Sequence, residues 1–207
     1  MGGKLGTIFA RAGHEVVFSY SHSKAKLEKL ARDAGGKTRA GTPAEAARDA
    51  DAVLLAVHWS RVDDVLKQAG DLSGKVVVSC SLPMMPDDSG LAIGHTTSGA
   101  EELARKMPQA RIVSAFNTLP SEVFFSVFAG DAGEAKPCVA YCSDDERAKK
   151  VAAQLITDAG FEPIDAGPLR ISRYTEPFAL LMGQLAYEGE RGPAVAYRFE
   201  WFDEREA

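Results

Sequence analysis

Short apolar strands alternate with amphipathic helices along nearly the whole sequence. The strand-like segments at 51–57, 75–82 and 110–118 are almost continuously apolar, which is typical of parallel strands buried on both faces. Helical patterns at 61–72 and 98–107 separate them. This order predicts an α/β fold with a doubly wound, mostly parallel sheet, whose ligands bind at the carboxyl ends of the strands.

The pattern divides the chain into two predicted parts. Residues 1–168 are expected to form a Rossmann domain, and residues 169–207 a small C-terminal part with a helix at 172–188 and an aromatic tail. The loop at 83–97 follows a strand and is long and rich in Gly, Pro and Ser. Such loops are often functional lids, although a plain surface excursion explains the composition equally well.

Composition and charge argue against several classes of protein. The net charge of −5 does not suit a broad nucleic-acid surface. The apolar runs are too short for a membrane span, and the N-terminus lacks a signal-peptide pattern, so we expect a cytoplasmic protein. The four histidines and three cysteines have no metal-ligand spacing, so no metal site is predicted. The cysteines are expected to be buried free thiols.

The chain opens on MGGKLG, in which paired glycines lead into a helical pattern. In a dinucleotide-binding fold, backbone N–H groups at such a helix start hold the pyrophosphate. Gly2 and Gly3 are therefore candidate cofactor-binding residues, and Gly6 is expected to let the helix lie close to the sheet. A flexible N-terminus explains two glycines equally well.

The first strand, at 15–20, runs into the sequence SYSHSK and not into a carboxylate. An NAD site places Asp or Glu there to bind the ribose hydroxyls, whereas the 2′-phosphate of NADP needs hydrogen-bond donors and positive charge. Ser19, Tyr20, Ser21 and Lys24 are therefore candidate cofactor-binding residues that favour NADP(H) over NAD(H). These residues also suit a helix cap with Ser23 as the N-cap, and the two roles are compatible.

Four stretches resemble the NADP-dependent deazaflavin (coenzyme F-420) reductase family of dinucleotide-binding oxidoreductases. They are GGKLGTIFARAGHEVVFS, DADAVLLAVHWSRVDDVL, TSGAEELARKMPQARIVSAFNTL and DAGFEPIDAGPLRISRYTEPFALLMGQLAY. The resemblance implies a Rossmann domain with a small C-terminal helical part. It also implies hydride transfer between NADP(H) and a planar acceptor, with coenzyme F-420 or a flavin as co-substrate.

Two features depart from this family. Its members begin with a strand and the motif G-x-G-N-x-G, whereas Met1 corresponds to the residue before the third glycine. The central strand of the usual order 3-2-1-4-5-6 is then missing, so we expect two unpaired neighbouring strands, half a phosphate loop and weak NADPH binding. The second departure is Leu82, because relatives have an amide there that is expected near the nicotinamide.

The remaining candidate cofactor-binding residues lie on loops that follow strands. They are Val57, His58, Trp59, Pro83, Phe116, Asn117 and Thr118. His58 and Trp59 are expected on the ribose side and Pro83 in an apolar wall. By resemblance, the last three residues flank the nicotinamide. Core packing competes as the explanation for Trp59, and local turn hydrogen bonds compete for His58 and Asn117.

No constellation of acid, base or nucleophile is evident in the sequence, so catalytic residues stay unassigned. Hydride transfer needs none, because the cofactors carry the chemistry and the protein supplies orientation. The alternative functions are a non-enzymatic or decayed dinucleotide-binding module, and a hydroxyacid dehydrogenase or imine reductase. Enzymes of the latter kind usually have a larger helical C-terminal domain.

The expected partners are a small-molecule hydride acceptor and a second copy of the chain, with no nucleic acid and no membrane. A helical apolar stripe and an aromatic tail lie near the C-terminus: Phe178, Leu181, Met182, Leu185, Tyr197, Phe199, Trp201 and Phe202. So many large apolar groups predict a homodimer through this part. Packing of the same groups onto the chain's own sheet is the competing explanation.

Overall fold

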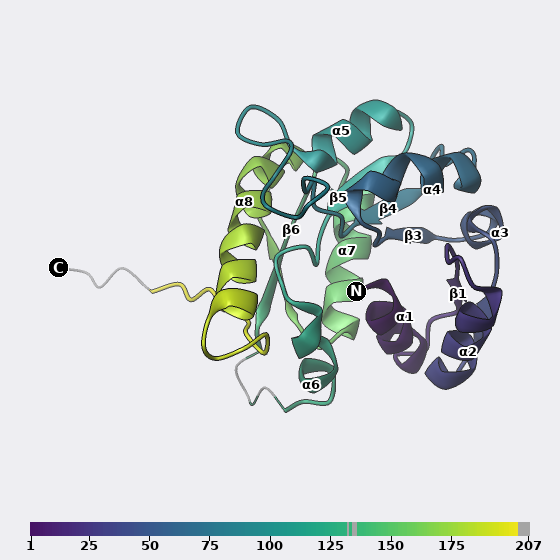
Figure 1. Ribbon diagram of the computed structural model, residues 1–207, viewed down its shortest axis with the longest axis horizontal. Coiled ribbons are helices and arrows are strands. Elements are labelled where there is room, and N and C mark those ends of the chain that lie inside the picture. The colour runs from purple at the N-terminus through teal and green to yellow at the C-terminus, as the bar shows by residue number, and fades with distance from the viewer. Residues whose placement is uncertain (132, 134–135, 203–207) are drawn as a thin grey trace.

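A computed structural model describes residues 1–131, 133 and 136–202 (Figure 1). Its main sheet has five strands in the order β3-β4-β5-β6-β7. Their bounds are Ala52–Leu55, Val76–Ser79, Arg111–Ser114, Cys138–Ser143 and Glu162–Asp165. All neighbours pair in parallel except β5 and β6, which are antiparallel. The predicted α/β fold with a mostly parallel sheet is thus confirmed.

A second, two-stranded parallel sheet pairs β1 (Val16–Phe18) with β2 (Thr38–Ala40). The strand β1 lies within the predicted segment at 15–20, whereas β2 was not predicted, because three residues carry too little pattern to detect. Within the described residues, β1 and β3 each have one edge without a strand partner. This agrees with the expectation of two strands that each lack a partner on one side.

Helices cover both faces of the main sheet (Figure 1). Their bounds are α1 Gly2–Arg11, α2 Lys24–Ala34, α3 Pro43–Arg48, α4 Val62–Ala69, α5 Gly99–Lys106, α6 Phe124–Phe128, α7 Glu146–Asp158 and α8 Ser172–Gly183. Short 3-10 turns precede α4, α6 and α8, at Trp59–Arg61, Ser121–Val123 and Leu169–Ile171, and a π-helical turn at Gln184–Glu188 follows α8. The predicted helix at 172–188 is therefore present but changes its hydrogen-bond pattern near its end.

The strand β4 shows why the sheet must be covered on both sides. Val76 and Val78 pack into a core with α1, α6 and α7, whereas Val77 packs into a second core with α4 and α5. All three side chains are fully buried. Alternate residues of a strand point to opposite faces, so the continuous apolar run is explained by burial on both faces.

The C-terminal part packs against the first of these cores. Met182 of α8 is buried there, and Phe178 and Tyr197 pack against it. Leu181 and Leu185 are 53% and 49% exposed, and Phe199, Trp201 and Phe202 are also exposed. The set of eight apolar residues predicted as one interface is thus divided, because three of them face the chain's own core and five are exposed. No helix in the described part of the chain is both long and apolar enough to cross a bilayer.

The open edges of β1 and β3 make a prediction about stability. A fused N-terminal segment of the form strand plus G-x-G-N is expected to pair with both edges and raise the melting temperature by at least ~3 °C. Thermal unfolding followed by circular dichroism measures the shift. A Gly/Ser extension of equal length is the control, and an equal melting temperature for both fusions would contradict strand insertion.

Candidate functional site

The carboxyl ends of β3, β4 and β5 lie at one edge of the sheet, since these three strands are parallel neighbours. The loops that leave this edge contain most of the predicted cofactor residues. Ser81 ties two of the loops together, because its Oγ donates to the carbonyl oxygen of Val57 at 2.7 Å. The fold thus brings the residues after β3, β4 and β5 to a common edge, where ligands of doubly wound sheets bind.

The glycines of the opening sequence sit in the first turns of α1, where neighbouring side chains approach closely. A Cβ atom on Gly2 would lie 3.2 Å from the Cβ of Ala56, just after β3, and one on Gly3 would lie 3.3 Å from Leu30 of α2. A Cβ on Gly6 would overlap the ring of Phe18. Gly6 therefore allows close packing of α1 on β1, as predicted, and Gly2 places the helix start beside the end of β3.

The residues after β1 form a turn that contacts α4. Tyr20 has a left-handed backbone conformation with φ 61°, and its Oη donates to Oδ2 of Asp64 in α4 at 2.7 Å. This hydrogen bond lowers the pKa of Asp64. Ser23 caps α2 by accepting from the N–H of Lys26, so the predicted cap is confirmed. Asp64 was not predicted, because α4 is distant from this turn in the sequence.

Lys24 and the serines keep their polar groups available at this turn. Ser19 is half-buried, whereas Ser21 is exposed and its Oγ accepts from the N–H of Ser23. The ammonium of Lys24 is 3.8 Å from Glu28 and its side chain is 87% exposed, so that ion pair is weak. The group therefore offers two hydroxyls and one cation, the donor set that a 2′-phosphate requires.

His58 connects the loop after β3 to the long loop after β4. Its Nε2 lies 2.9 Å from Oδ1 of Asp88, and its Nδ1 lies 2.8 Å from Oγ of Ser60. His58 also caps the turn Trp59–Arg61. The local role considered for His58 is therefore present, together with a hydrogen bond to Asp88 that was not predicted. Trp59 and Val57 are partly buried against the second core, so both have a packing role.

The loop at 83–97 folds back on itself. The N–H of Ala92 donates to the carbonyl of Pro83 at 2.7 Å, and the N–H of Met85 donates to the carbonyl of Gly90 at 2.8 Å. Met84 and Leu91 form an isolated β-bridge. Pro83 is buried, which suits the predicted apolar wall.

The sequence AFNT, residues 115–118, follows β5, and its side chains point in different directions. Phe116 is fully buried with φ 64° and meets Phe9 and Phe124 edge to face. Its side chain therefore belongs to the core, so only its backbone is available to flank the nicotinamide. Asn117 is 5% exposed and donates from Nδ2 to Ser114, while its Oδ1 has no hydrogen-bond partner in the described structure.

Thr118 is linked to the C-terminal tail. Its Oγ1 lies 2.7 Å from the hydroxyl of Tyr197, which also accepts from the N–H of Ala140 at 3.0 Å. The ring of Tyr197 packs edge to face on Phe178. The tail thus braces the loop after β5, a role for Tyr197 that the sequence analysis did not assign.

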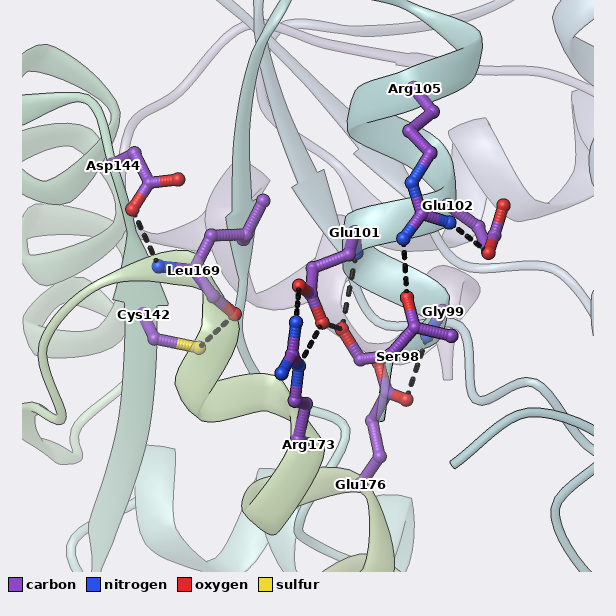
Figure 2. Close-up of polar contacts among 11 residues, drawn as sticks. Ser98, Gly99, Glu101, Glu102, Arg105, Cys142, Asp144, Leu169, Arg173 and Glu176 are labelled. Atoms are coloured by element: carbon purple, nitrogen blue, oxygen red, sulfur yellow. Dashed lines mark hydrogen bonds and ion pairs between the residues drawn. The ribbon is translucent and has the colours of Figure 1, made fainter. Parts of the chain in front are cut away.

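A polar cluster joins α5 and α8 beside this edge (Figure 2). Arg173 donates from Nε and Nη2 to the two oxygens of Glu101, at 2.8 and 2.6 Å. Glu176 accepts from the N–H groups of Gly99 and Ala100. The sequence carried one signal for Glu176: it shares the buried side of α8 with Ser172, Ala179 and Met182, so a carboxylate falls among core positions.

The protein surface also carries hollows. A hollow of about 600 Å³ is lined by Phe161, Arg198 and Trp201 among others, and a second of about 570 Å³ by Arg11 and Phe125 among others. Neither is lined by a predicted cofactor residue. In the described part of the chain, no three His, Cys, Asp or Glu side chains gather as a metal site would require.

Parts of the chain are similar to proteins described as oxidoreductases. Residues 1–83 match the model of a family described as NADP oxidoreductase coenzyme F420-dependent, which confirms for this region the resemblance found in the sequence. Metalloreductase STEAP3 of Rattus norvegicus is 29% identical over 138 residues, or 66% of this chain and 26% of that protein. The chain thus spans about a quarter of the length of this curated relative.

Two solved structures share the fold. A candidate F420-dependent NADP-reductase from Arthrobacter sp. FB24 has a TM-score of 0.84 at 22% identity, covering 97% of this chain and 95% of its own. A hypothetical protein from Sinorhizobium meliloti has a TM-score of 0.71 at 28% identity, covering 83% and 82%. The family matched by residues 1–83 is described as NADP-linked, and the likeness to the first solved structure shows the fold alone.

The turn after β1 generates a prediction about cofactor choice. Lys24→Ala is expected to weaken NADPH binding about tenfold, because a charge-assisted contact to the 2′-phosphate is lost, and to change NADH binding less than about twofold. Fluorescence titration of both nucleotides measures this. Lys29→Ala, on the same helix, is the control, and an equal loss for NADPH and NADH would remove Lys24 from the phosphate site.

The contact between Thr118 and Tyr197 predicts a cost for losing one hydroxyl. Tyr197→Phe leaves the N–H of Ala140 and the hydroxyl of Thr118 without this buried partner, so the free energy of unfolding is expected to fall by ~1–3 kcal/mol. Urea denaturation measures the change. Tyr174→Phe is the matched control, since Tyr174 is 65% exposed; equal effects would mean that the tail does not brace the loop.

Proposed function

We propose that this chain is an NADPH-dependent oxidoreductase that transfers hydride between NADP(H) and a deazaflavin, a flavin or another planar acceptor. The observation that carries the proposal is the donor set after β1, in which Ser19, Ser21 and Lys24 stand where an NAD site has a carboxylate. The family match over residues 1–83 supports the same reading.

The residues at the carboxyl edge suit the parts of such a cofactor. The start of α1 offers free N–H groups for a pyrophosphate, and the turn after β1 offers donors for the 2′-phosphate. The unpartnered Oδ1 of Asn117 suits an N–H donor such as a nicotinamide carboxamide. Leu82, which is half-buried, supplies no polar group where relatives have an amide. The protein thus offers recognition at three points.

The chemistry asked of the protein is orientation. When bound, the nicotinamide supplies a hydride, and the acceptor gains the same two electrons. Asn117 would hold the ring by its carboxamide, and Pro83 would give an apolar surface beside it. Holding two reactants in register lowers a barrier by roughly 7–11 kcal/mol, so no protein acid or base is required. The protein therefore needs to fix the positions of the two rings rather than supply charge. Pro83 and Asn117 suit this role, because both are uncharged and buried.

The test is turnover with a defined panel. NADPH oxidation is followed with coenzyme F-420, FMN, FAD and riboflavin, and with hydroxyacid and imine substrates as alternatives. Turnover with a planar acceptor that falls in Asn117→Ala, with 2′,5′-ADP binding unchanged, supports the proposal. NADPH binding with no turnover would indicate a binding module, and turnover restricted to hydroxyacids or imines would indicate another enzyme class.

We further propose that the chain forms a homodimer through α8 and the tail. Tyr174, Leu181 and Leu185 are exposed on or just after α8, and Trp201 and Phe202 are exposed beyond it. Covering these side chains with a second copy removes apolar surface from water. The proposal commits to the exposed members of the predicted stripe and tail, since Phe178, Met182 and Tyr197 are already packed inside.

The dimer makes a prediction about mass in solution. Leu181→Lys with Leu185→Lys is expected to convert a dimer into a monomer, because both lysines would be buried in the interface. Light scattering at micromolar concentration measures the mass. Phe125→Ser, which changes another exposed apolar residue, is the control and should leave the dimer intact. A monomeric wild-type protein would rule the proposal out.

A further inference from the structure

Glu176 is a carboxylate in the interior of the protein. It belongs to α8 and is 1% exposed, on the helix side that also carries buried Ala179 and Met182. Burial of an isolated charge is costly and needs compensating hydrogen bonds. The neighbours of Glu176 therefore decide what it does.

The start of α5 supplies that compensation (Figure 2). Oε2 of Glu176 accepts from the N–H of Gly99 at 2.8 Å, and Oε1 accepts from the N–H of Ala100 at 3.0 Å. The N–H of Glu101 is taken by the Ser98 side chain. The first N–H groups of a helix lack partners within the helix and carry partial positive charge. The carboxylate of α8 thus caps α5 from outside.

The capped turn is in contact with the cofactor side of the sheet. Gly99 lies against the ring of Pro83, because a Cβ atom there would be only 3.0 Å from Cδ of Pro83. Both residues are buried, so the first turn of α5 cannot shift without moving Pro83. Pro83 is the apolar wall of the proposed cofactor site. A physical path of two contacts, from Glu176 to Gly99 and from Gly99 to Pro83, therefore leads from α8 to that wall.

We propose that Glu176 is a positioning residue, whose ionised carboxylate holds the start of α5 and, through Gly99, the Pro83 wall of the cofactor site. Only the ionised group has two oxygens that both accept strongly from N–H groups. Protonation turns one oxygen into a hydroxyl and weakens one of the two bonds. The part of the inference that concerns the cofactor rests on the proposed function.

Several charged or titratable groups face this carboxylate. Burial raises the pKa of Glu176 to about 7, against the opposing effect of the Gly99 and Ala100 N–H groups, and Glu101 of α5 adds to the rise. Arg173 neutralises Glu101 through its two hydrogen bonds. Cys142 of β6 faces Glu176 as a neutral thiol, because burial raises its pKa to about 11. The Glu176 carboxyl group that caps α5 therefore titrates near neutral pH.

The sign of the stability change follows from linkage. The folded chain holds the Glu176 proton more tightly than the unfolded chain, whose ordinary pKa is 4.5. The stabilisation from this group is fully present below that value and is lost as the pH rises through about 7. Ionisation of Glu176 thus strengthens the cap on α5 but lowers the free energy of unfolding of the whole protein.

The experiment compares wild type, Glu176→Gln and the control Glu102→Gln between about pH 5.5 and pH 8.5. Glu102 lies in the first turn of α5, like Gly99 and Ala100, and pairs with Arg105 on the surface. The wild-type melting temperature is expected to fall relative to Glu176→Gln as the pH rises, with the control following wild type. Hydrogen exchange of peptides covering residues 82–100, corrected for intrinsic rates, should show protection that rises with pH in wild type and control only.

Two ligands separate this inference from the proposed function. NADPH spans the whole site, whereas 2′,5′-ADP occupies only the adenosine half. Glu176→Gln is expected to weaken NADPH binding about fivefold at about pH 8.5, the low end for coupled sites, and to leave 2′,5′-ADP binding unchanged. Equal weakening of both ligands, or equal exchange in wild type and Glu176→Gln, would overturn the positioning role.

The remaining outcomes also decide. If neither nucleotide binds, the proposed function is rejected, and the link to a cofactor site falls with it, while the exchange data still show whether Glu176 holds Pro83. If Glu176→Gln does not fold, the test rests on the pH dependence of hydrogen exchange in wild type and Glu102→Gln. Protection of residues 82–100 that does not rise as the pH passes the pKa of Glu176 would overturn the positioning role.

Discussion

Parallel hydrogen bonding between β3, β4 and β5 organises everything else in the molecule. Register pairs such as Leu55 with Ser79 and Ser79 with Ser114 align the last residues of the three strands. The chain must then leave all three at the same edge, and the loops after them meet. Full burial of β4 on both faces makes the arrangement rigid, so the edge is a fixed platform for side chains that arrive from distant parts of the sequence.

The sequence predicted what depends on local pattern and missed what depends on three-dimensional contact. Continuous apolar runs located β3, β4 and β5, and the Ser23 cap followed from residue type. The strand β2 escaped because Thr38–Ala40 is short and only partly buried. The burial of Phe116 also escaped, because its left-handed backbone at φ 64° turns the side chain into the core, and a left-handed phenylalanine is rare.

The unpredicted site contacts share one cause. Tyr20 with Asp64, His58 with Asp88, and Thr118 with Tyr197 all join segments that are separated by 30 or more positions. Pairings over such separations are set by topology, which a pattern of residue types does not encode. In each pair a predicted cofactor residue is held by a residue from another segment of the chain. These three residues are therefore supported by α4, the long loop and the tail together.

The cysteines have a consequence for how unfolding is observed. Cys80, Cys138 and Cys142 are free and buried, and burial raises the thiol pKa of each, to about 12 for Cys80 and about 11 for Cys142. Reactivity requires an exposed thiolate, so an alkylating reagent meets each thiol only when its surroundings open. The three lie on β4's end and at the two ends of β6. Under native conditions, the labelling rate of Cys80 would therefore report how often the centre of the sheet opens. The rates of Cys138 and Cys142 would report separately how often β6 opens.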